Sequence, residues 1–279
     1  MIDLHSHSLH SDGTETPSSL ALEAHARGLK ALALTDHDTL AGLPEFLACQ
    51  PQCSTRLIPG IELSCRFVDM ELHLLGLFLD INDPTLQERV MGLRRRREDR
   101  NHRMLERLRE LGIRMEWEDV KSHAGADLVS RAHFARALHR LGFAGSPQDA
   151  FKRIIGDGCP GYVPFQELEP EEACRWIREA KGVPVVAHPG RSARRSFRWD
   201  VAMADLKGIG VCGFETYYAD YSPIEERYFL NLAKELGMAR SGGSDYHGAT
   251  KPGINLGVGR GTLNVPDEIL DELEGWCQR

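Results

Sequence analysis

Histidine, aspartate and glutamate residues occur in short clusters along nearly the whole chain of 279 residues. The first cluster contains His5 and His7, and side chains two apart in an extended segment point the same way, so this pair can bind one ion. One pair alone is weak support, because histidines two apart also arise by chance; it is the combination that indicates a site. The residues concerned are His5, His7, Asp12, Asp36, His37, Asp38, Glu62, His73, His188, Asp245 and His247. Imidazole nitrogens and carboxylate oxygens together suit manganese, iron or zinc better than calcium or magnesium.

Short apolar runs that precede or contain these residues predict the strands that position them. The expected strands cover residues 2–4, 31–34, 57–61, 72–78, 183–187, 213–216 and 238–241. Helical patterns at 16–27, 170–181 and 223–236 lie between some of them, and each is followed by a glycine that can end a helix. This alternation predicts an α/β fold with a parallel sheet, and about seven units favour a closed or distorted barrel. The carboxyl ends of parallel barrel strands meet at one face, so distant ligands can converge there.

The middle of the chain has a different pattern, which predicts a helical insertion. An arginine-rich stretch at 93–112 has apolar residues at helical spacing, and further helices are expected to begin near Ser130 and Ser146. We therefore expect a barrel domain made of residues 1–90 and 167–279, and a helical insertion at 91–166 that contributes to substrate binding.

Four residues of the insertion are candidates for binding a substrate: Arg100, Asn101, Arg131 and His133. Arg131 and His133 would open a helix capped by Ser130. Cations are disfavoured at a helix N-terminus while anions are favoured there, so a basic pair in this place makes sense if a phosphate docks against it. For most arginines of the 93–112 stretch, a solvated face with ion pairs is the preferred interpretation.

Other polar residues allow two interpretations each. Glu215 could support the ligands or be an ordinary strand-end carboxylate, and the tyrosines at 217, 218 and 221 could stack on a base or pack at the barrel lip. His10 or Asp38 could act as a general acid, although turn packing is the simpler role for His10.

Composition narrows the class of protein. Apolar residues make up 42% of the chain and charged residues 27%, which is ordinary for a globular protein. The net charge of −7 argues against a surface for duplex DNA, which needs broad neutralisation of phosphates. The 7 cysteines include no CxxC pair, and neither a signal peptide nor a membrane-length apolar run is visible. We therefore expect a cytoplasmic protein that does not associate with membranes.

The ordered motifs HSHSLHSDG, LTDHD, GIELS, HLLG, AHPG and GGSDYH resemble those of the PHP family, named for polymerase and histidinol phosphatase. The resemblance implies a distorted (β/α)7 barrel and three divalent metal ions, with manganese expected and iron or zinc as alternatives. It further implies that His5, His7, Glu62 and Asp245 hold one ion. A second ion would share Glu62 and add His73 and His188. The third would take Asp12, His37 and His247.

Such a cluster fits hydrolysis of phosphoesters, because water between two metals is activated for attack on phosphorus and the metals stabilise the developing charge. The resemblance is greatest to the bacterial branch that acts on nucleoside 3′,5′-bisphosphates and trims short RNA from the 5′ end. We therefore expect removal of the 3′-phosphate from compounds such as adenosine 3′,5′-bisphosphate, with a nucleotide or short oligoribonucleotide as substrate. Two alternatives stay open: a histidinol phosphate phosphatase, and a non-catalytic PHP module that supports a partner protein.

Overall fold

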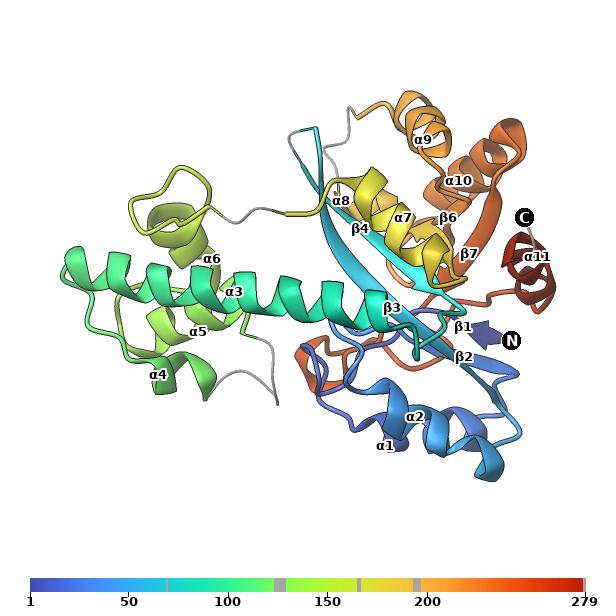
Figure 1. The fold of residues 1–279 in the computed structure, drawn as a ribbon, viewed down its shortest axis with the longest axis horizontal. Coiled ribbons are helices and arrows are strands. Elements are labelled where there is room, and N and C mark those ends of the chain that lie inside the picture. The colour runs from blue at the N-terminus through green and yellow to red at the C-terminus, as the bar shows by residue number, and fades with distance from the viewer. Residues whose placement is uncertain (69, 123–128, 165–166, 193–196, 278–279) are drawn as a thin grey trace. The chain divides into compact units, whose positions relative to one another are not determined.

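The computed structural model describes residues 1–68, 70–122, 129–164, 167–192 and 197–277. The chain forms two compact units (Figure 1). The first consists of Met1–Val90 and Glu167–Arg279, and the second of Met91–Gln166. Within the described residues, no helix is both long enough and apolar enough to cross a membrane.

Seven strands form one sheet in the first unit, and their spatial order is their order in the chain. They are β1 (Ile2–Asp3), β2 (Ala31–Leu34), β3 (Arg56–Phe67), β4 (Met70–Leu77), β5 (Val183–Val186), β6 (Gly213–Tyr218) and β7 (Ala239–Gly243). The segments after β1 and β7 also pair, because the Leu4 N–H donates to Gly242 O at 3.1 Å and Ser6 forms a parallel bridge with Tyr246. The sheet thus nearly closes on itself, and the expected distorted barrel is confirmed.

One strand departs from the expected parallel arrangement. Strand β4 runs antiparallel to both β3 and β5, whereas the other neighbouring strands are parallel. Phe67 of β3 pairs directly with Met70 of β4, so only two residues connect them. A parallel crossover needs a dozen or more residues, and this short connection therefore forces a hairpin. His73 consequently lies within a reversed strand and not at a carboxyl end.

Alternate residues of each strand point into the barrel and the residues between them point outward, because successive side chains of a strand lie on opposite faces of the sheet. Ile2, Ala31 and Ala33 belong to the interior cluster, whereas Leu32 and Leu34 pack outside against the first helices. The interior cluster also takes in residues of the last helix. Its buried members are Ile2, Leu4, Ala31, Ala33, Ile58, Leu75, Leu77, Val183, Val185, Ala187, Cys212, Ala239, Leu263, Val265, Ile269 and Leu273.

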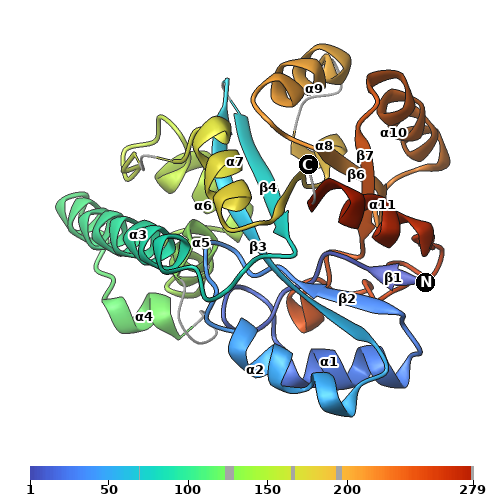
Figure 2. The same ribbon diagram turned by 45° about the vertical axis from the view of Figure 1, so that its right-hand side comes forward.

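Helices surround the sheet of the first unit (Figure 2). They are α1 (Pro17–Ala26), α2 (Leu43–Ala48), α7 (Pro170–Glu179), α8 (Pro189–Ser192), α9 (Trp199–Gly208), α10 (Pro223–Leu236) and α11 (Glu268–Cys277), with short 3-10 turns η1 (Gln50–Gln52) and η3 (Gly248–Thr250). Helix α10 has the expected bounds. Ser222 caps its first turn and Gly237, at φ 58°, ends it in the left-handed conformation.

Helix α11 covers one end of the barrel. Its Glu272 accepts a hydrogen bond from the Arg240 N–H at 2.9 Å, and its Glu274 pairs with Arg56. Arg56 and Arg240 stand at the amino ends of β3 and β7. Because α11 covers this end of the barrel, a site can form at the opposite end. The ligand-type residues lie there.

The second unit is helical in its described residues and has its own core. Helix α3 (Pro84–Glu110) starts in the first unit and continues into the second, where it is followed by α4 (Trp117–Lys121), α5 (Arg131–Arg140), α6 (Pro147–Ala150) and the π-helical turn η2 (Phe151–Ile155). The apolar face of α3 packs Met104 and Leu108 with Phe134 and Leu138 of α5. Helix α5 begins at Arg131 after Ser130, as predicted.

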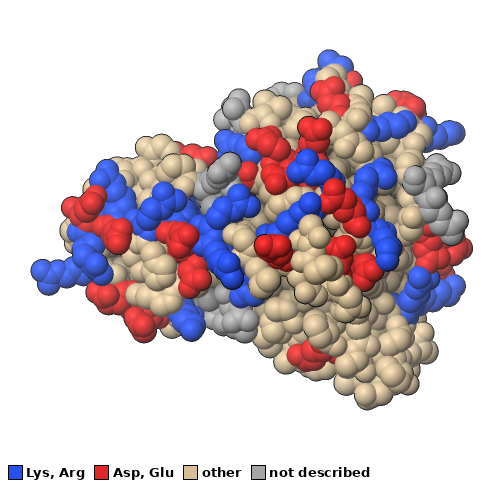
Figure 3. All heavy atoms as spheres, viewed as in Figure 1, with Lys and Arg blue, Asp and Glu red and all other residues tan. Residues whose placement is uncertain are grey.

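Several charged residues of the second unit form local ion pairs. Arg107 pairs with Glu110 at 2.8 Å and Arg140 with Asp119 at 2.8 Å. On the face shown in Figure 3, Lys and Arg side chains alternate with Asp and Glu over the α3 region, whereas the surface over α1 and α2 carries few charges. Such exposed pairs contribute little stability, and the mixed signs fit a solvated face.

A close approach between β7 and the segment after β1 yields a first prediction. A Cβ on Gly243 would lie 2.5 Å from the His5 Cβ and 2.6 Å from the His5 backbone nitrogen. The Gly243→Ala variant should therefore unfold more easily in urea, by about 1–3 kcal/mol, and bind less metal because His5 is displaced.

The control for this prediction is Gly275→Ala in α11. Apart from its chain neighbours and the backbone of its own helix, no described atom lies within 4 Å of the Cβ that this change adds. Alanine favours a helix by up to about 1 kcal/mol over glycine, so the control should be as stable as the wild type or more stable. Equal effects of the two substitutions would contradict the argument.

Candidate metal centre

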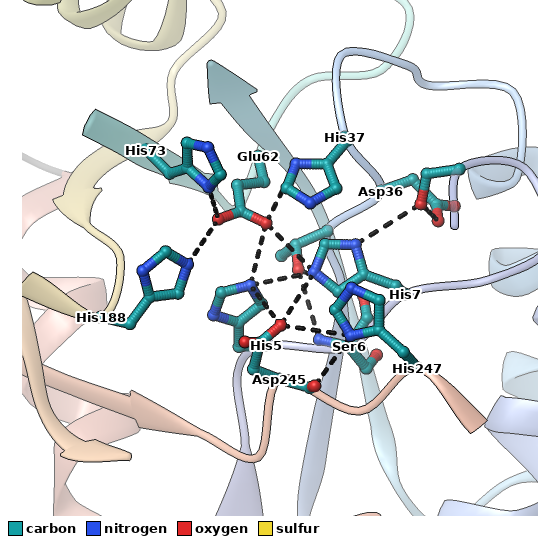
Figure 4. A network of polar contacts seen from close by, with 12 residues as sticks. His5, Ser6, His7, Asp36, His37, Glu62, His73, His188, Asp245 and His247 are labelled. Atoms are coloured by element: carbon teal, nitrogen blue, oxygen red, sulfur yellow. Dashed lines mark hydrogen bonds and ion pairs between the residues drawn. The ribbon is translucent and has the colours of Figure 1, made fainter. Parts of the chain in front are cut away.

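The segments that follow β1 and β7 bring two histidines and a carboxylate together (Figure 4). The Nε2 atoms of His5 and His7 are 3.0 Å apart. Asp245 Oδ1 lies 3.5 Å from the His5 nitrogen and 3.4 Å from the His7 nitrogen. His5 and His7 thus point the same way, as their spacing predicts, and their ring nitrogens face a shared carboxylate.

Glu62 lies in the middle of β3 and connects this group with a second one. Its Oε2 is 3.0 Å from His5 Nε2 and 3.1 Å from His7 Nε2. Its Oε1 is 2.8 Å from His73 Nδ1 and 3.1 Å from His188 Nε2. The carboxylate is fully buried. Its two oxygens therefore face two different sets of imidazoles, which is the arrangement of a bridging ligand.

The remaining ligand-type residues form a third group beside His7. His247 Nε2 lies 3.1 Å from Asp12 Oδ1, and His37 Nε2 lies 4.0 Å from Asp12 Oδ2. The rings of His7 and His247 stack with centroids 4.1 Å apart. All nine residues that the family resemblance implies as ligands therefore lie in one place, and four overlapping groups of them have ligand atoms within 4.8 Å of one another.

Two of these residues have an uncommon backbone conformation. Asp245 has φ 54° and His188 has φ 28°, both in the positive range that non-glycine residues seldom adopt. Each lies two residues after the end of a strand, His188 after β5 and Asp245 after β7. Such conformations persist only where the surrounding structure enforces them, and they are typical of functional sites.

Buried carboxylates behind the site hold the ligand-bearing segments. Glu215 of β6 accepts from the His188 N–H at 2.6 Å, and its other oxygen lies 3.1 Å from His5 Nδ1. Glu215 thus supports two ligand-type histidines, which favours the first of its two interpretations. Asp38 bonds both the backbone N–H and the hydroxyl of Ser64, each at 3.0 Å, and so anchors β3.

The tyrosines of β6 and the following loop have different roles. Tyr218 donates to Asp245 Oδ2 at 2.7 Å. Burial raises its pKa, and the nearby Asp245 charge adds to this, so the hydroxyl keeps its proton. Tyr221 accepts from the Gly190 N–H at 3.0 Å and stacks on Phe229, while Tyr217 packs against the barrel core. These described contacts are hydrogen bonds and packing within the protein, and stacking on a base is not needed to explain them.

Lys251 is a site residue that the sequence does not reveal. It follows η3 and bonds both Asp245 Oδ2 and, at 3.0 Å, the Tyr218 hydroxyl. A single lysine in a loop carries no spacing signal, and only its position six residues after Asp245 could have suggested it.

The donor set fits divalent cations. His5 Nε2 and His7 Nε2 face each other and two carboxylate oxygens at distances of 3.0–3.5 Å. Ligand bonds of about 2.0–2.2 Å around one ion place donor atoms roughly 3.0–3.5 Å apart. Moreover, Asp12 Oδ1 and His37 Nδ1 are buried and form no hydrogen bond within the described residues, although each lies within 3.3 Å of a ligand-type residue, His247 and Glu62 respectively. Buried polar atoms are normally satisfied, and a divalent cation between these residues would satisfy both atoms.

Electrostatics show how strongly the carboxylates and histidines depend on one another. Burial alone would raise the pKa of Glu62, but the surrounding charges of His37, His5 and His73 hold it well below its usual range. Burial opposes the charged form of His7, yet its bonds to Asp245 and Glu62 raise its pKa to about 9. Burial lowers the pKa of His37 to about 4, which leaves that ring neutral at pH 7.

The chain is similar to known phosphoesterases over nearly its whole length. Residues 3–141 match the PHP domain model. The chain is 36% identical over 263 residues to the 5′-3′ exoribonuclease Rnm of Salmonella typhimurium, which covers 91% of this chain and 87% of that protein. It is 33% identical over 279 residues to the 3′,5′-nucleoside bisphosphate phosphatase of Chromobacterium violaceum, with coverage of 98% and 96%. The chain belongs to the PHP family.

Solved structures agree with this assignment. A PHP-fold neighbour from Bifidobacterium adolescentis, described as a metal-dependent phosphoesterase, has a TM-score of 0.81 at 29% identity and covers 98% of this chain and 94% of its own. A Chromobacterium violaceum protein, described as an amidohydrolase with bound sulfate, has a TM-score of 0.82 at 32% identity, with coverage of 98% and 96%. This PHP protein is therefore a metal-dependent hydrolase of phosphoric esters, as the motifs indicate.

The four candidate substrate residues lie in the second unit and are described there by themselves. Arg100, Asn101 and His133 are buried. Asn101 Nδ2 donates to Val129 O at 2.7 Å, and His133 Nδ1 accepts from the Ser130 N–H at 2.9 Å as part of a capping box. Arg131 pairs with Asp157 at 2.9 Å. Asn101, His133 and Arg131 therefore each have a local structural partner, and a role of the four residues in binding substrate remains a proposal.

The raised pKa of His7 predicts a pH dependence of metal uptake. Without metal, His7 carries a proton below about pH 9, and an imidazolium cannot be a ligand, so binding must release that proton. The apparent affinity for Mn²⁺ should increase from pH 7 towards pH 9, by up to about tenfold per pH unit for each proton released, and then level off.

Calorimetric titration of the metal-free protein with Mn²⁺ measures this release, if it is repeated in two buffers of different ionisation enthalpy. A dissociation constant that is independent of pH, with no buffer-dependent heat, would rule out a protonated His7.

Proposed function

We propose that three divalent ions, manganese in the first instance, occupy this centre. His5, His7, Glu62 and Asp245 would hold the first ion. His73 and His188 would hold the second together with Glu62, while Asp12, His37 and His247 would hold the third. The observation that supports this division is the orientation of Glu62, whose two oxygens face separate sets of imidazoles at 2.8–3.1 Å.

The ions would activate water and stabilise negative charge on the phosphoryl group. Other residues of the protein hold the proposed ligands in the positions that this chemistry needs. Glu215 fixes His5 and the backbone at His188, and Tyr218 and Lys251 fix Asp245 Oδ2 so that Oδ1 is directed at His5 and His7.

The Glu62→Gln variant tests the assignment of ligands. An amide keeps the size of the side chain but removes the charge that bridges the two groups, so metal content should fall and kcat/KM should decrease by more than about 100-fold. Glu179→Gln, which breaks only an exposed ion pair with Arg89, is the control and should behave like the wild type. Full metal content and full activity in Glu62→Gln would refute the bridging role.

We further propose that the substrate is a nucleoside 3′,5′-bisphosphate, such as adenosine 3′,5′-bisphosphate, from which the 3′-phosphate is removed. Short RNA degraded from the 5′ end is a second substrate of the same chemistry. The proposal is supported by the two relatives, one a 3′,5′-nucleoside bisphosphate phosphatase and one a 5′-3′ exoribonuclease, both similar over most of this chain. It is also supported by the basic residues of the second unit, which suit a second phosphate.

A comparison of substrates tests the proposal directly. The manganese-loaded protein should turn over adenosine 3′,5′-bisphosphate with a higher kcat/KM than histidinol phosphate or an aryl phosphate. Faster turnover of histidinol phosphate would favour the alternative phosphatase. Nucleotides with phosphates at the 2′, 3′ and 5′ positions should show which ester is cleaved.

Arg131→Ala extends this comparison to the grip on the second phosphate. Loss of one charge-assisted hydrogen bond, about 1.5–3 kcal/mol, should raise KM for the bisphosphate by roughly tenfold or more and leave KM for an aryl phosphate unchanged. Arg140→Ala is a matched control, because Arg140 lies at the other end of α5 and also pairs with one carboxylate, Asp119. Equal changes of KM for both substrates would argue against a second-phosphate site at Arg131.

A further inference from the structure

Lys251 lies beside the candidate metal centre in a loop that the ligand-bearing segments hold in place. The Thr250 hydroxyl bonds Asp12 O at 2.8 Å and His247 O at 3.0 Å, and the Ala249 N–H donates to Thr14 Oγ1 at 3.0 Å. The backbone at Lys251 is therefore tied to the segments that carry two ligand-type residues. Its ammonium has a fixed place relative to the site.

The ammonium is held between two oxygens. It bonds Asp245 Oδ2 and the Tyr218 hydroxyl, the latter at 3.0 Å, and lies 5.4 Å from the centroid of the Tyr218 ring. An ammonium has three N–H donors. Within the described part of the chain its hydrogen bonds go to these two oxygens, which leaves one donor for a ligand. The Lys251 side chain is 29% exposed, against 6% for Asp245, so a ligand can reach it.

A purely structural role for Lys251, that of holding Asp245, does not explain why the residue carries a positive charge. Tyr218 already donates to Asp245 Oδ2 at 2.7 Å, so a neutral donor satisfies that oxygen. A lysine so close to the ligands repels divalent cations and competes with them for the carboxylate, which lowers metal affinity. Once cations share the Asp245 carboxylate, that carboxylate no longer balances the lysine alone, and a second anion beside the ammonium becomes favourable. The anion that this site must accommodate is the phosphoryl group.

We propose that Lys251 is a catalytic residue whose ammonium contacts a non-bridging oxygen of the phosphoryl group during hydrolysis. In the reaction the bond from phosphorus to the leaving oxygen breaks and a bond to the oxygen of water forms. One proton of that water ends on the leaving oxygen, which departs as an alcohol, and the other stays on the phosphate product. Lys251 keeps its proton throughout and stabilises the charge on the equatorial oxygens. This inference rests on the metal centre proposed above, but it is independent of which phosphoester is the natural substrate, because every substrate presents the same phosphoryl group.

The Lys251→Met variant tests the proposal, because it keeps the length of the side chain and removes the charge. We expect kcat/KM to fall about 100-fold for both an aryl phosphate and a bisphosphate, as the loss of one preorganised donor typically does. The inhibition constant for inorganic phosphate should rise, by about tenfold. Metal content, measured on the same preparation, should stay at the wild-type level. Lys251→Arg should recover part of the activity.

Lys181→Met is the matched control, because Lys181 pairs with Asp80 at 2.7 Å next to the amino end of β5, away from the centre. It should leave activity and phosphate inhibition unchanged. If Lys251→Met does not fold, Lys251→Gln supplies the same comparison with a polar side chain.

Two results would overturn the proposal. Unchanged kcat/KM and phosphate inhibition in Lys251→Met would show that the ammonium does not contact the phosphoryl group. A fall in metal content that accounts for the whole loss of activity would make Lys251 a positioning residue for Asp245. A wild-type protein that shows no preference for bisphosphates would contradict the proposed substrate but leave the aryl phosphate comparison intact.

Discussion

The structure of the site depends on a single buried charge, the carboxylate of Glu62. It has no exposed surface and lies within 3.3 Å of ring nitrogens from five histidines: His5, His7, His37, His73 and His188. An ionised carboxylate in such a place is strongly destabilising unless positive charge surrounds it. In the metal-free protein protonated histidines can supply that charge, and in the loaded protein cations would replace the protons. The same group thus couples folding of the barrel to occupation of the site.

Two features of the barrel bring these groups together. Most ligand-type residues follow the carboxyl ends of parallel strands, where chain segments distant in sequence meet. His73 reaches the same place from a reversed strand. Pairing of Ser64 with His73 across the β3–β4 hairpin puts the ring near Glu62, which is two residues earlier in β3. The hairpin therefore supplies two members of one ligand group, Glu62 and His73, from a continuous stretch of chain.

Much of this was predictable from the sequence, and the exceptions have physical causes. The motifs singled out nine ligand-type residues that the structure brings together, most of them just after strand ends, and helix α10 was bounded by its proline and glycine. The antiparallel direction of β4 was missed because an alternating apolar pattern predicts a strand but does not show whether the strand runs parallel or antiparallel to its neighbours. Lys251 was missed because its partners, Asp245 and Tyr218, become its neighbours only when β6, β7 and the following loop are assembled. A role of Arg131 and His133 in binding substrate remains a prediction; their described contacts include an ion pair with Asp157 and a capping box at Ser130.

The serines of the motifs have an explanation that only the structure provides. Ser8 and Ser11 both donate to the buried Asp36, Ser64 donates to Asp38, and Ser244 donates through its hydroxyl and its N–H to Asp3. Each pair connects a ligand-bearing segment to a neighbouring one and contributes hydrogen bonds to a buried carboxylate. The motifs therefore contain two kinds of acid: those that face the centre, and those that are bound by serines behind it. The positions of the ligand-type residues are therefore held by hydrogen-bonded loops as well as by the strands, and the serines behind the site keep those loops in place.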